Sequence, residues 1–120
     1  MKHILYIDDN SQACLLLKLF LEKEGYRVFT TRETQTARKV LSKETIDCII
    51  TDIGLPDENG IEFYQWVQQQ PEYKNLFFLF VSGHAVGFDQ VLTEHKDNFI
   101  TKPIFFPDLI DRLNRELKSN

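Results

Sequence analysis

Short apolar runs alternate along the chain with segments whose apolar residues recur at helical spacing. The runs are rich in Ile, Val, Phe and Leu and are bounded by polar residues or Gly, a pattern typical of buried strands. They cover residues 3–7, 27–30, 47–51, 77–81 and 98–100. The segments between them predict helices at residues 12–23, 33–42, 61–69 and 86–94. A last helix is predicted near Pro107, with Leu109, Ile110, Leu113 and Leu117 at helical spacing.

Five strands that alternate with five helices predict a parallel sheet, because a helical crossover returns the chain to the end of the sheet where the previous strand began. Continuous apolar strands fit a sheet that helices cover on both faces, so the fold class is α/β, doubly wound. The chain has 120 residues, 42% of them hydrophobic and 27% charged, which suits a single compact domain over residues 1–120. In such folds ligands bind outside the carboxyl ends of the strands, and candidate chemistry is expected there.

Charge and apolar content argue against several classes of partner. The 14 Lys and Arg residues are outnumbered by 18 Asp and Glu, for a net charge of -4, whereas nucleic acids and anionic membranes favour clustered cations. We therefore expect no direct nucleic-acid or membrane partner. The most apolar stretch is interrupted by Lys18 and is shorter than the ~20 residues of a membrane span. No signal-peptide core precedes Asp8 and Asp9, which favours the cytoplasm. Cys14 and Cys48 have neither metal-ligand nor redox spacing and are expected to be buried, reduced thiols.

Polar residues stand at the ends of four of the five predicted strands. They are Asp8 and Asp9 after the first, Asp52 after the third, Ser82 with Gly83 after the fourth, and Lys102 with Pro103 after the fifth. Three carboxylates held close together repel one another, so a cation is expected to neutralise them, and Mg2+ suits a site that leaves room for water and phosphate oxygens. Asp forms acyl-phosphate intermediates, and Lys and Ser can hold phosphoryl oxygens. Each group alone is usually a turn or a cap, but their joint occurrence predicts a site.

The same residues, in the same order, resemble the receiver domain of two-component response regulators. The resemblance runs from about Lys2 to Leu117 and rests on Asp8-Asp9, Thr51-Asp52-Ile53-Gly54-Leu55-Pro56-Asp57-Glu58-Asn59-Gly60, Ser82-Gly83 and Lys102-Pro103. It implies a flavodoxin-like sheet with the strand order 2-1-3-4-5. It also implies that Asp52 accepts a phosphoryl group from a phosphohistidine on a histidine kinase or phosphotransfer protein. The chain would then be a phosphoacceptor that catalyses its own phosphotransfer and dephosphorylation, and not an enzyme with a separate substrate.

The resemblance further implies a set of metal ligands. Asp9 looks like a direct ligand of Mg2+, for which Mn2+ could substitute, and Asp8 looks like a ligand through water. The backbone carbonyl of Gly54, two residues after Asp52, looks like a further contribution of the protein.

A conformational switch is also implied. Lys102 would pair with the phosphoryl oxygens, the hydroxyl of Ser82 would move toward them, and the ring of Phe99 would rotate into the space that Ser82 leaves. Phe99 is explained about equally well as a buried strand residue. The peptide bond between Lys102 and Pro103 is expected to be cis.

Several positions depart from the usual receiver pattern. Gly54 and His84 stand at positions that control the access of water in the family, so the lifetime of the phosphorylated state is not predicted. The first helix carries Leu15, Leu16, Leu17, Leu19, Phe20 and Leu21 and is apolar on more than one face. We hypothesise that part of it, including Leu15, forms a partner or homodimer surface, with burial under neighbouring helices as the alternative. Phe105 and Phe106 replace the usual capping residues of the last helix, and at least one of them is predicted to be an exposed contact.

Four other functions compete with a stand-alone phosphoacceptor. The chain can be a receiver from a larger response regulator or hybrid kinase, or a degenerate receiver that only binds partners. A phosphatase of the haloacid dehalogenase type requires a second acid two residues after the nucleophile, where this chain has Gly54. A flavodoxin-like cofactor binder requires a phosphate-binding loop after the first strand, where Asp8, Asp9 and Asn10 would repel phosphate. The downstream target and the process regulated are not indicated.

Overall fold

The computed structural model describes residues 1–83 and 96–118. Its strands are β1 (His3–Ile7), β2 (Arg27–Thr31), β3 (Cys48–Asp52), β4 (Phe77–Ser82) and β5 (Phe99–Thr101). Its helices are α1 (Ser11–Lys23), α2 (Thr34–Lys43), α3 (Gly60–Gln68) and α5 (Phe106–Leu113). A short 3₁₀ turn, Lys96–Asn98, precedes β5, and a π-helical segment, Asn114–Lys118, continues α5.

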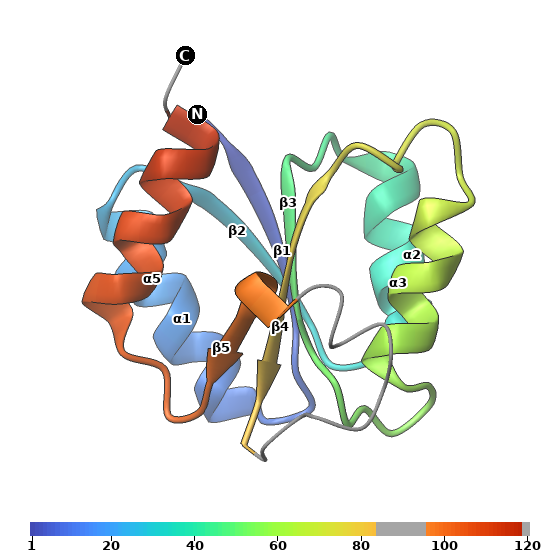
Figure 1. The fold of residues 1–120 in the computed structure, drawn as a ribbon, viewed down its shortest axis with the longest axis horizontal. Coiled ribbons are helices and arrows are strands. Elements are labelled where there is room, and N and C mark those ends of the chain that lie inside the picture. Colours follow the sequence, from blue (N-terminus) through green and yellow to red (C-terminus); the bar gives the residue numbers. More distant parts are fainter. Residues whose placement is uncertain (84–95, 119–120) are drawn as a thin grey trace.

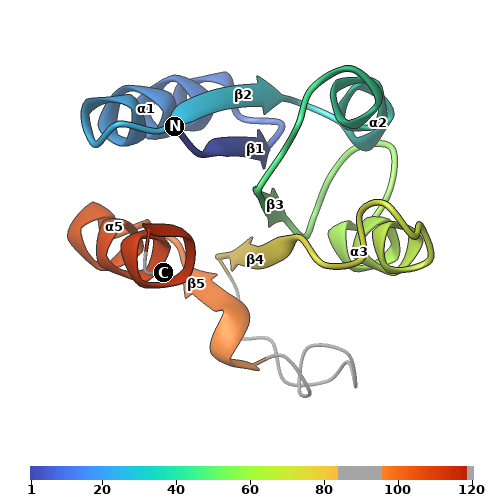
Figure 2. The same ribbon diagram turned by 90° about the horizontal axis from the view of Figure 1, so that it is seen from above.

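The five strands form one parallel sheet in the order β2-β1-β3-β4-β5, which confirms the predicted fold class and strand order. Figures 1 and 2 show three layers, with α1 and α5 on one face of the sheet and α2 and α3 on the other. The described residues hold four of the five predicted helices. The helix expected at residues 86–94 lies outside them, and so does His84.

Two apolar clusters hold these layers together. One lies between the sheet and the α1 and α5 layer and includes Ile4, Ile50, Val81, Leu17, Leu109 and Leu113. The other lies under α2 and α3 and includes Leu5, Ile49, Phe80, Ala37, Phe63 and Val67. Because neighbouring residues of a strand point to opposite faces, both sets of side chains are buried in the central strands β1, β3 and β4, and these strands are mostly apolar in sequence.

Six strand ends, in β2, β3, β4 and β5, differ from the sequence expectation by one residue. β3 and β4 extend through Asp52 and Ser82, because Asp52 still pairs with Val81 and Ser82 with Thr101. β5 begins at Phe99, after Asn98 closes the 3₁₀ turn and donates its side-chain amide to the Phe78 carbonyl at 2.7 Å. Asp52 and Ser82 are therefore the last paired residues of β3 and β4. The pairing with the neighbouring strand fixes the backbone at both positions.

The two cysteines are buried as the sequence predicts. Cys14 and Cys48 are both buried, unpaired thiols. Burial raises the pKa of Cys14 to about 11 and also raises the pKa of Cys48, so both stay protonated and unreactive at neutral pH. Among the described residues, no helix combines the length and apolar content that crossing a bilayer requires.

Candidate functional site

Three carboxylates converge at the carboxyl end of the sheet. Asp8 and Asp9 follow β1 and Asp52 ends β3, the strand next to it. Oxygen atoms of the three side chains lie within 4.8 Å of one another. The chain leaves β1 toward β2 on one side and returns to β3 on the other, so the acids occupy the switch point at which such folds bind ligands. Asp8 is fully buried, Asp52 is mostly buried and Asp9 is exposed, so the cluster opens to solvent at Asp9.

Lys102 joins two of these carboxylates. Its Nζ lies 3.0 Å from Oδ2 of Asp8 and 3.0 Å from Oδ2 of Asp52. Burial by itself would lower the pKa of Lys102, but the hydrogen bonds and charges of the two aspartates outweigh it and raise that pKa. One ammonium thus offsets part of the repulsion among three acids, and the cluster retains excess negative charge.

Asp8 is held by further donors, one of which the sequence reasoning missed. The hydroxyl of Tyr6 donates to Oδ2 of Asp8 at 2.6 Å, and the backbone N–H of Asn10 donates to Oδ1 at 3.0 Å. Burial, followed by the hydrogen bond to Asp8, raises the pKa of Tyr6, so the hydroxyl stays a donor. Residues two apart on a strand share a face, and this spacing could have identified Tyr6 as a neighbour of Asp8.

Asn10 also fixes where α1 begins. Its side-chain oxygen accepts the backbone N–H groups of Gln12 and Ala13, at 2.9 and 3.0 Å, as an N-cap residue does. The chain therefore passes from β1 into α1 immediately after the two acids, with no flexible loop between them.

The acidic cluster fits a hard divalent cation. Carboxylate and carbonyl oxygens are the ligands that Mg2+ prefers, and Asp8, Asp9 and Asp52 offer three carboxylates within reach of one ion. Gly54 follows Asp52 by two residues, and its N–H makes only a long contact, 3.4 Å, with Oδ1 of Asp52. No atom lies within 4 Å of the place that a Gly54 side chain would occupy, so the site is open on that side.

The residues predicted to form the switch lie beside this cluster. Ser82 is buried at the end of β4, and its carbonyl accepts the backbone N–H of Lys102 at 2.9 Å. The Lys102–Pro103 peptide bond is cis, as expected. Phe99 is half-buried on β5 and stacks on Phe80 with 5.2 Å between ring centroids. Strand alternation places Ser82 on the same face of the sheet as Phe80, and therefore as Phe99.

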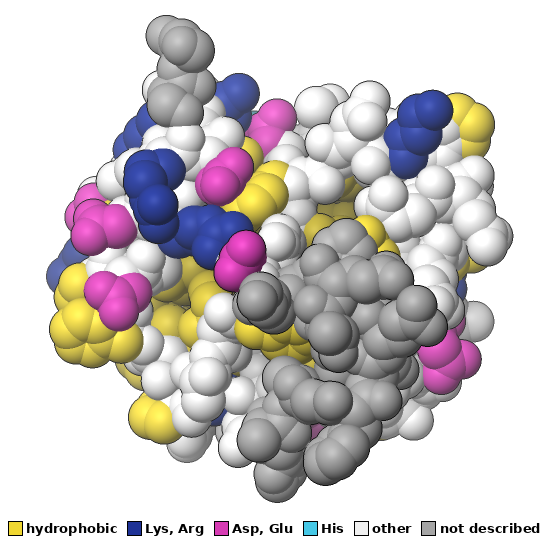
Figure 3. Space-filling model, viewed as in Figure 1, with side chains coloured by type: hydrophobic (Ala, Val, Ile, Leu, Met, Phe, Trp, Pro, Cys, Tyr) yellow, Lys and Arg dark blue, Asp and Glu magenta, His cyan; other side chains and the backbone are white. Residues whose placement is uncertain are grey.

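The other predicted contact residues lie apart from the acids, on α1 and at the start of α5. Leu15 and Phe105 are 60% and 64% exposed, whereas Phe106 is half-buried and stacks on Phe20 of α1 with 4.4 Å between centroids. We call Leu15, Leu16, Leu19, Phe20 and Phe105 the α1 patch; all five are exposed apolar side chains. Figure 3 shows hydrophobic side chains gathered at its lower left, where α1 and the start of α5 lie. The alternative that α1 is covered by neighbouring helices is therefore wrong for the described part of the chain.

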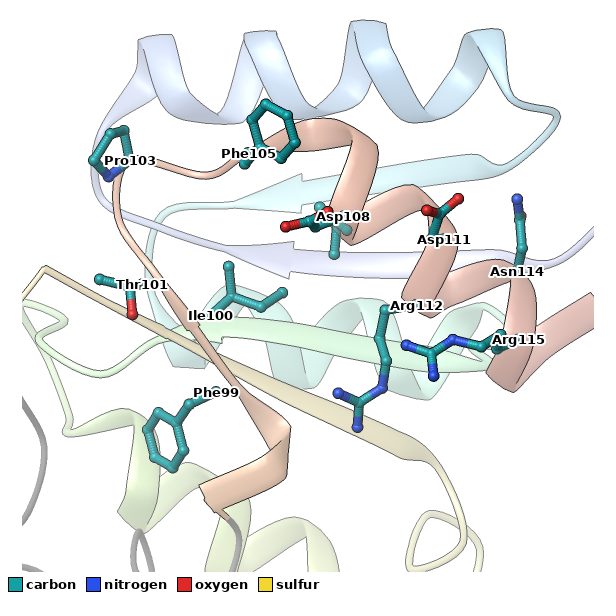
Figure 4. A pocket seen from close by; sticks show the side chains of 11 residues that line it. Phe99, Ile100, Thr101, Pro103, Phe105, Asp108, Asp111, Arg112, Asn114 and Arg115 are labelled. Atoms are coloured by element: carbon teal, nitrogen blue, oxygen red, sulfur yellow. The ribbon is translucent and has the colours of Figure 1, made fainter.

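A groove between β5 and α5 lies apart from the acidic site. It measures about 810 Å3 and lies between β5 and α5, with Thr101, Phe105, Asp108 and Arg112 in its walls (Figure 4). None of the three carboxylates lines it. A second groove of about 660 Å3 does reach the site, since it extends from Asp9 to Leu15 and Lys18 on α1.

The family is decided by comparison with known proteins. The family model described as "Response regulator receiver domain" matches residues 4–114, which is most of the chain. The chain belongs to this family. Receiver domains of two-component response regulators act in phosphorelay signalling with histidine kinases or phosphotransfer proteins. The acids, Lys102 and Ser82 stand at or just after the carboxyl ends of the strands, where the strand pattern placed them.

Individual relatives support the assignment as a receiver. The chain is 26% identical over 117 residues to the TorCAD operon transcriptional regulatory protein TorR of Escherichia coli K12, covering 96% of this chain and 50% of TorR. It is 31% identical over 117 residues to the regulatory protein VanR of Enterococcus faecium, covering 96% of this chain and 49% of VanR. The receiver thus spans about half the length of these curated relatives.

Solved structures give the same result. The chemotaxis response regulator CheY4 of Vibrio cholerae matches with a TM-score of 0.86 at 25% identity, over 98% of this chain and 99% of that one. The response regulator TrrA of Thermotoga maritima, solved in complex with Mg2+-BeF, matches with a TM-score of 0.85 at 25% identity, over 98% and 100% of the two chains.

Proposed function

We propose that this receiver accepts a phosphoryl group on Asp52 in a reaction that depends on Mg2+. The observation that carries the proposal is the convergence of Asp8, Asp9 and Asp52 within 4.8 Å, with Lys102 bridging two of them at 3.0 Å. Asp52 is the member of the cluster that ends a central strand and is neither fully buried nor fully exposed. It is thus rigidly placed, yet a phosphodonor can reach it.

In the proposed reaction a carboxylate oxygen of Asp52 forms a bond to phosphorus while the bond between phosphorus and the donor histidine nitrogen breaks. Asp8, Asp9 and the Gly54 carbonyl would hold the cation with Asp52. When bound, Mg2+ would neutralise the negative charge on the phosphoryl oxygens. This neutralisation is the main requirement of phosphoryl transfer. Lys102 exchanges its contact with the carboxylate of Asp52 for one with the new phosphoryl oxygens, because these carry more negative charge.

The same charge would drive the switch. Ser82 and Phe99 share one face of the sheet, and Lys102 is hydrogen-bonded to the Ser82 backbone, so a phosphoryl group at Asp52 can attract the Ser82 hydroxyl and free space for the Phe99 ring. The receiver acts as a phosphoacceptor in the cytoplasm, with no separate substrate, and passes its signal through a changed protein surface. It functions either alone or as the receiver of a longer response regulator. The match covers about half of TorR and about half of VanR, which supports the longer form.

Intact-mass measurement after incubation with acetyl phosphate or phosphoramidate tests the proposal. We expect the mass to rise by one phosphoryl group when Mg2+ is present, and no rise when EDTA removes the metal, because the carboxylates then repel the donor. No rise with Mg2+ present would favour a degenerate receiver that only binds partners. A rise that is unaffected by EDTA would refute the metal requirement.

The α1 patch is proposed as the surface that docks the phosphodonor protein. Its helix starts directly after Asp9, and the groove of about 660 Å3 runs from Asp9 to Leu15. A protein that brings a phosphohistidine to Asp52 therefore meets the exposed leucines of α1 next to the acids. Exposed apolar patches of this kind typically mark protein interaction sites.

Leu15→Gln is expected to weaken binding to a histidine kinase that phosphorylates the chain by roughly tenfold, since it places a polar amide in an apolar contact. Surface plasmon resonance measures the affinity, and Lys39→Gln, on the opposite face of the sheet, is the matched control and should bind like the wild type. Unchanged kinase affinity would refute the docking role. A loss of self-association instead, measured by sedimentation velocity, would assign the patch to a homodimer.

A further inference from the structure

The N-terminus of α2 is capped by a residue from a distant loop. Glu33, at the N-cap position, makes no side-chain hydrogen bond to the helix N–H groups. Asp57, in the loop after β3, supplies these bonds: Oδ1 accepts the Thr34 N–H and Oδ2 the Gln35 N–H, both at 3.1 Å. Its Oδ2 also accepts the Thr34 hydroxyl at 2.9 Å. Partial burial would raise the pKa of Asp57, but these donors hold it below its ordinary value.

The neighbouring Glu58 adds a second connection to the same helix. Its Oε1 lies 2.7 Å from the Thr34 hydroxyl, whose one proton it shares with Asp57, and both of its oxygens bind the Arg38 guanidinium, at 3.0 and 3.3 Å. Arg38 in turn lies 4.5 Å from the centroid of the Trp66 ring on α3. A bidentate pair held over an aromatic ring has little freedom to reorient, so the tip of the loop is tied to α2 at two consecutive residues.

The base of this loop is equally constrained. Gly54 and Asn59 form an isolated antiparallel bridge, and the Gly60 N–H donates to the Ile53 carbonyl at 2.7 Å. A side chain at Gly60 would lie only 2.3 Å from the backbone oxygen of Asp52, so the start of α3 is pressed against the phosphoacceptor. The segment from Asp52 to Gly60 is therefore a closed loop, and a displacement of its tip moves Gly54 as well.

We propose that Asp57 and Glu58, through Thr34 and Arg38, are positioning residues that hold the Gly54 carbonyl at the metal site. This inference rests on the proposed function, in which that carbonyl is a ligand. Mg2+ requires nearly ideal octahedral geometry with ligands at about 2.1 Å, so a small shift of one backbone oxygen weakens binding. Gly54 itself is exposed, and the tie to α2 adds to the bridge with Asn59 in keeping it in place.

Two variants separate positioning from helix capping. Asp57→Ala removes the cap of α2 and one of the two ties to the loop, and leaves the tie through Glu58. In the double variant Asp57→Ala/Glu33→Asp, a short acid at the N-cap position restores the cap from within α2, but the tie through Asp57 stays broken. Isothermal titration calorimetry gives the affinity for Mg2+, and thermal unfolding gives the stability.

We expect Asp57→Ala to bind Mg2+ roughly tenfold more weakly, as is typical when support of a ligand is removed, and the double variant to regain stability but not affinity. Glu58→Gln should show a smaller loss of affinity in the same direction. Unchanged affinity in Asp57→Ala, or affinity that returns together with stability in the double variant, would refute positioning. These measurements need no phosphoryl transfer, so a wild type that binds Mg2+ but takes up no phosphoryl group would refute the proposed function and leave this inference standing.

Discussion

Asp52→Ala is expected to abolish phosphoryl uptake, with a fall in rate of roughly a thousandfold or more, as for loss of a nucleophile. The remaining acids are poor substitutes. Asp8 is fully buried, and its oxygens are taken up by Tyr6, Asn10 and Lys102. Asp9 is exposed and outside the sheet. The measurement is intact mass after incubation with phosphoramidate and Mg2+, followed over time.

The variant should remain folded, which makes the loss interpretable. Removing one of three mutually repelling carboxylates relieves repulsion, and Lys102 keeps its contact with Asp8. Thermal unfolding without Mg2+ should therefore show no fall in stability. Asp111→Ala removes an exposed carboxylate on α5 and is the matched control, expected to be phosphorylated like the wild type. Undiminished uptake by Asp52→Ala would show that another residue is the acceptor.

Lys102→Met is expected to lower the free energy of unfolding in the absence of Mg2+ by about 2 kcal/mol. Fully buried ion pairs lose roughly 3–5 kcal/mol when one partner is removed, and this loss should be smaller because the Lys102 side chain is 30% exposed. The variant leaves Asp8 and Asp52 without their shared cation, and Met keeps most of the aliphatic stem. Chemical denaturation measures the change, and Lys39→Met on α2 is the control.

The same variant separates the roles of the lysine and the metal. Lys102 neutralises part of the charge on Asp8 and Asp52 that would attract a divalent cation, so Lys102→Met should bind Mg2+ more tightly than the wild type, yet accept phosphoryl groups more slowly. Weaker binding of Mg2+ would refute this effect of the lysine charge. Unchanged stability without Mg2+ would show that the ion pairs contribute nothing to the fold.

The pH dependence of this stability difference has a definite sign. Asp8 and Asp52 raise the pKa of Lys102 above 10.5, so the ion pair contributes its full stability below pH 10.5 and loses it as the pH rises through the higher value of the folded protein. The difference between wild type and Lys102→Met should therefore stay constant through neutral pH and shrink in strong alkali.

Some features could be read from the sequence because they depend on local pattern. The apolar runs predicted all five strands, with boundaries at most one residue away at each end, since burial on both faces leaves few polar positions inside a strand. Gly25 follows α1 with a φ of +93°, as expected for a glycine that ends a helix. The acids at the ends of β1 and β3 were predicted to meet because parallel strands end at the same edge of a sheet.

Other features depend on residues far apart in the chain, and no local pattern contains them. The sequence left both a partner surface and burial beneath neighbouring helices open for the first helix, and the packing of the helices leaves Leu15 and Phe105 uncovered. The sequence analysis gave Asp57 no role, and its contact with Thr34 joins two loops that only the folded sheet brings together.

The sequence by itself determined the fold class, which follows from strand-length periodicity, and it predicted an acidic site from polar residues at strand ends. The family follows from the resemblance of these motifs to receiver domains and from the matching family model. The tertiary structure decided which donors hold those acids, which side of α1 stays uncovered, and how the loop of Gly54 is anchored. These depend on the distances between elements, which arise only when the helices pack on the sheet.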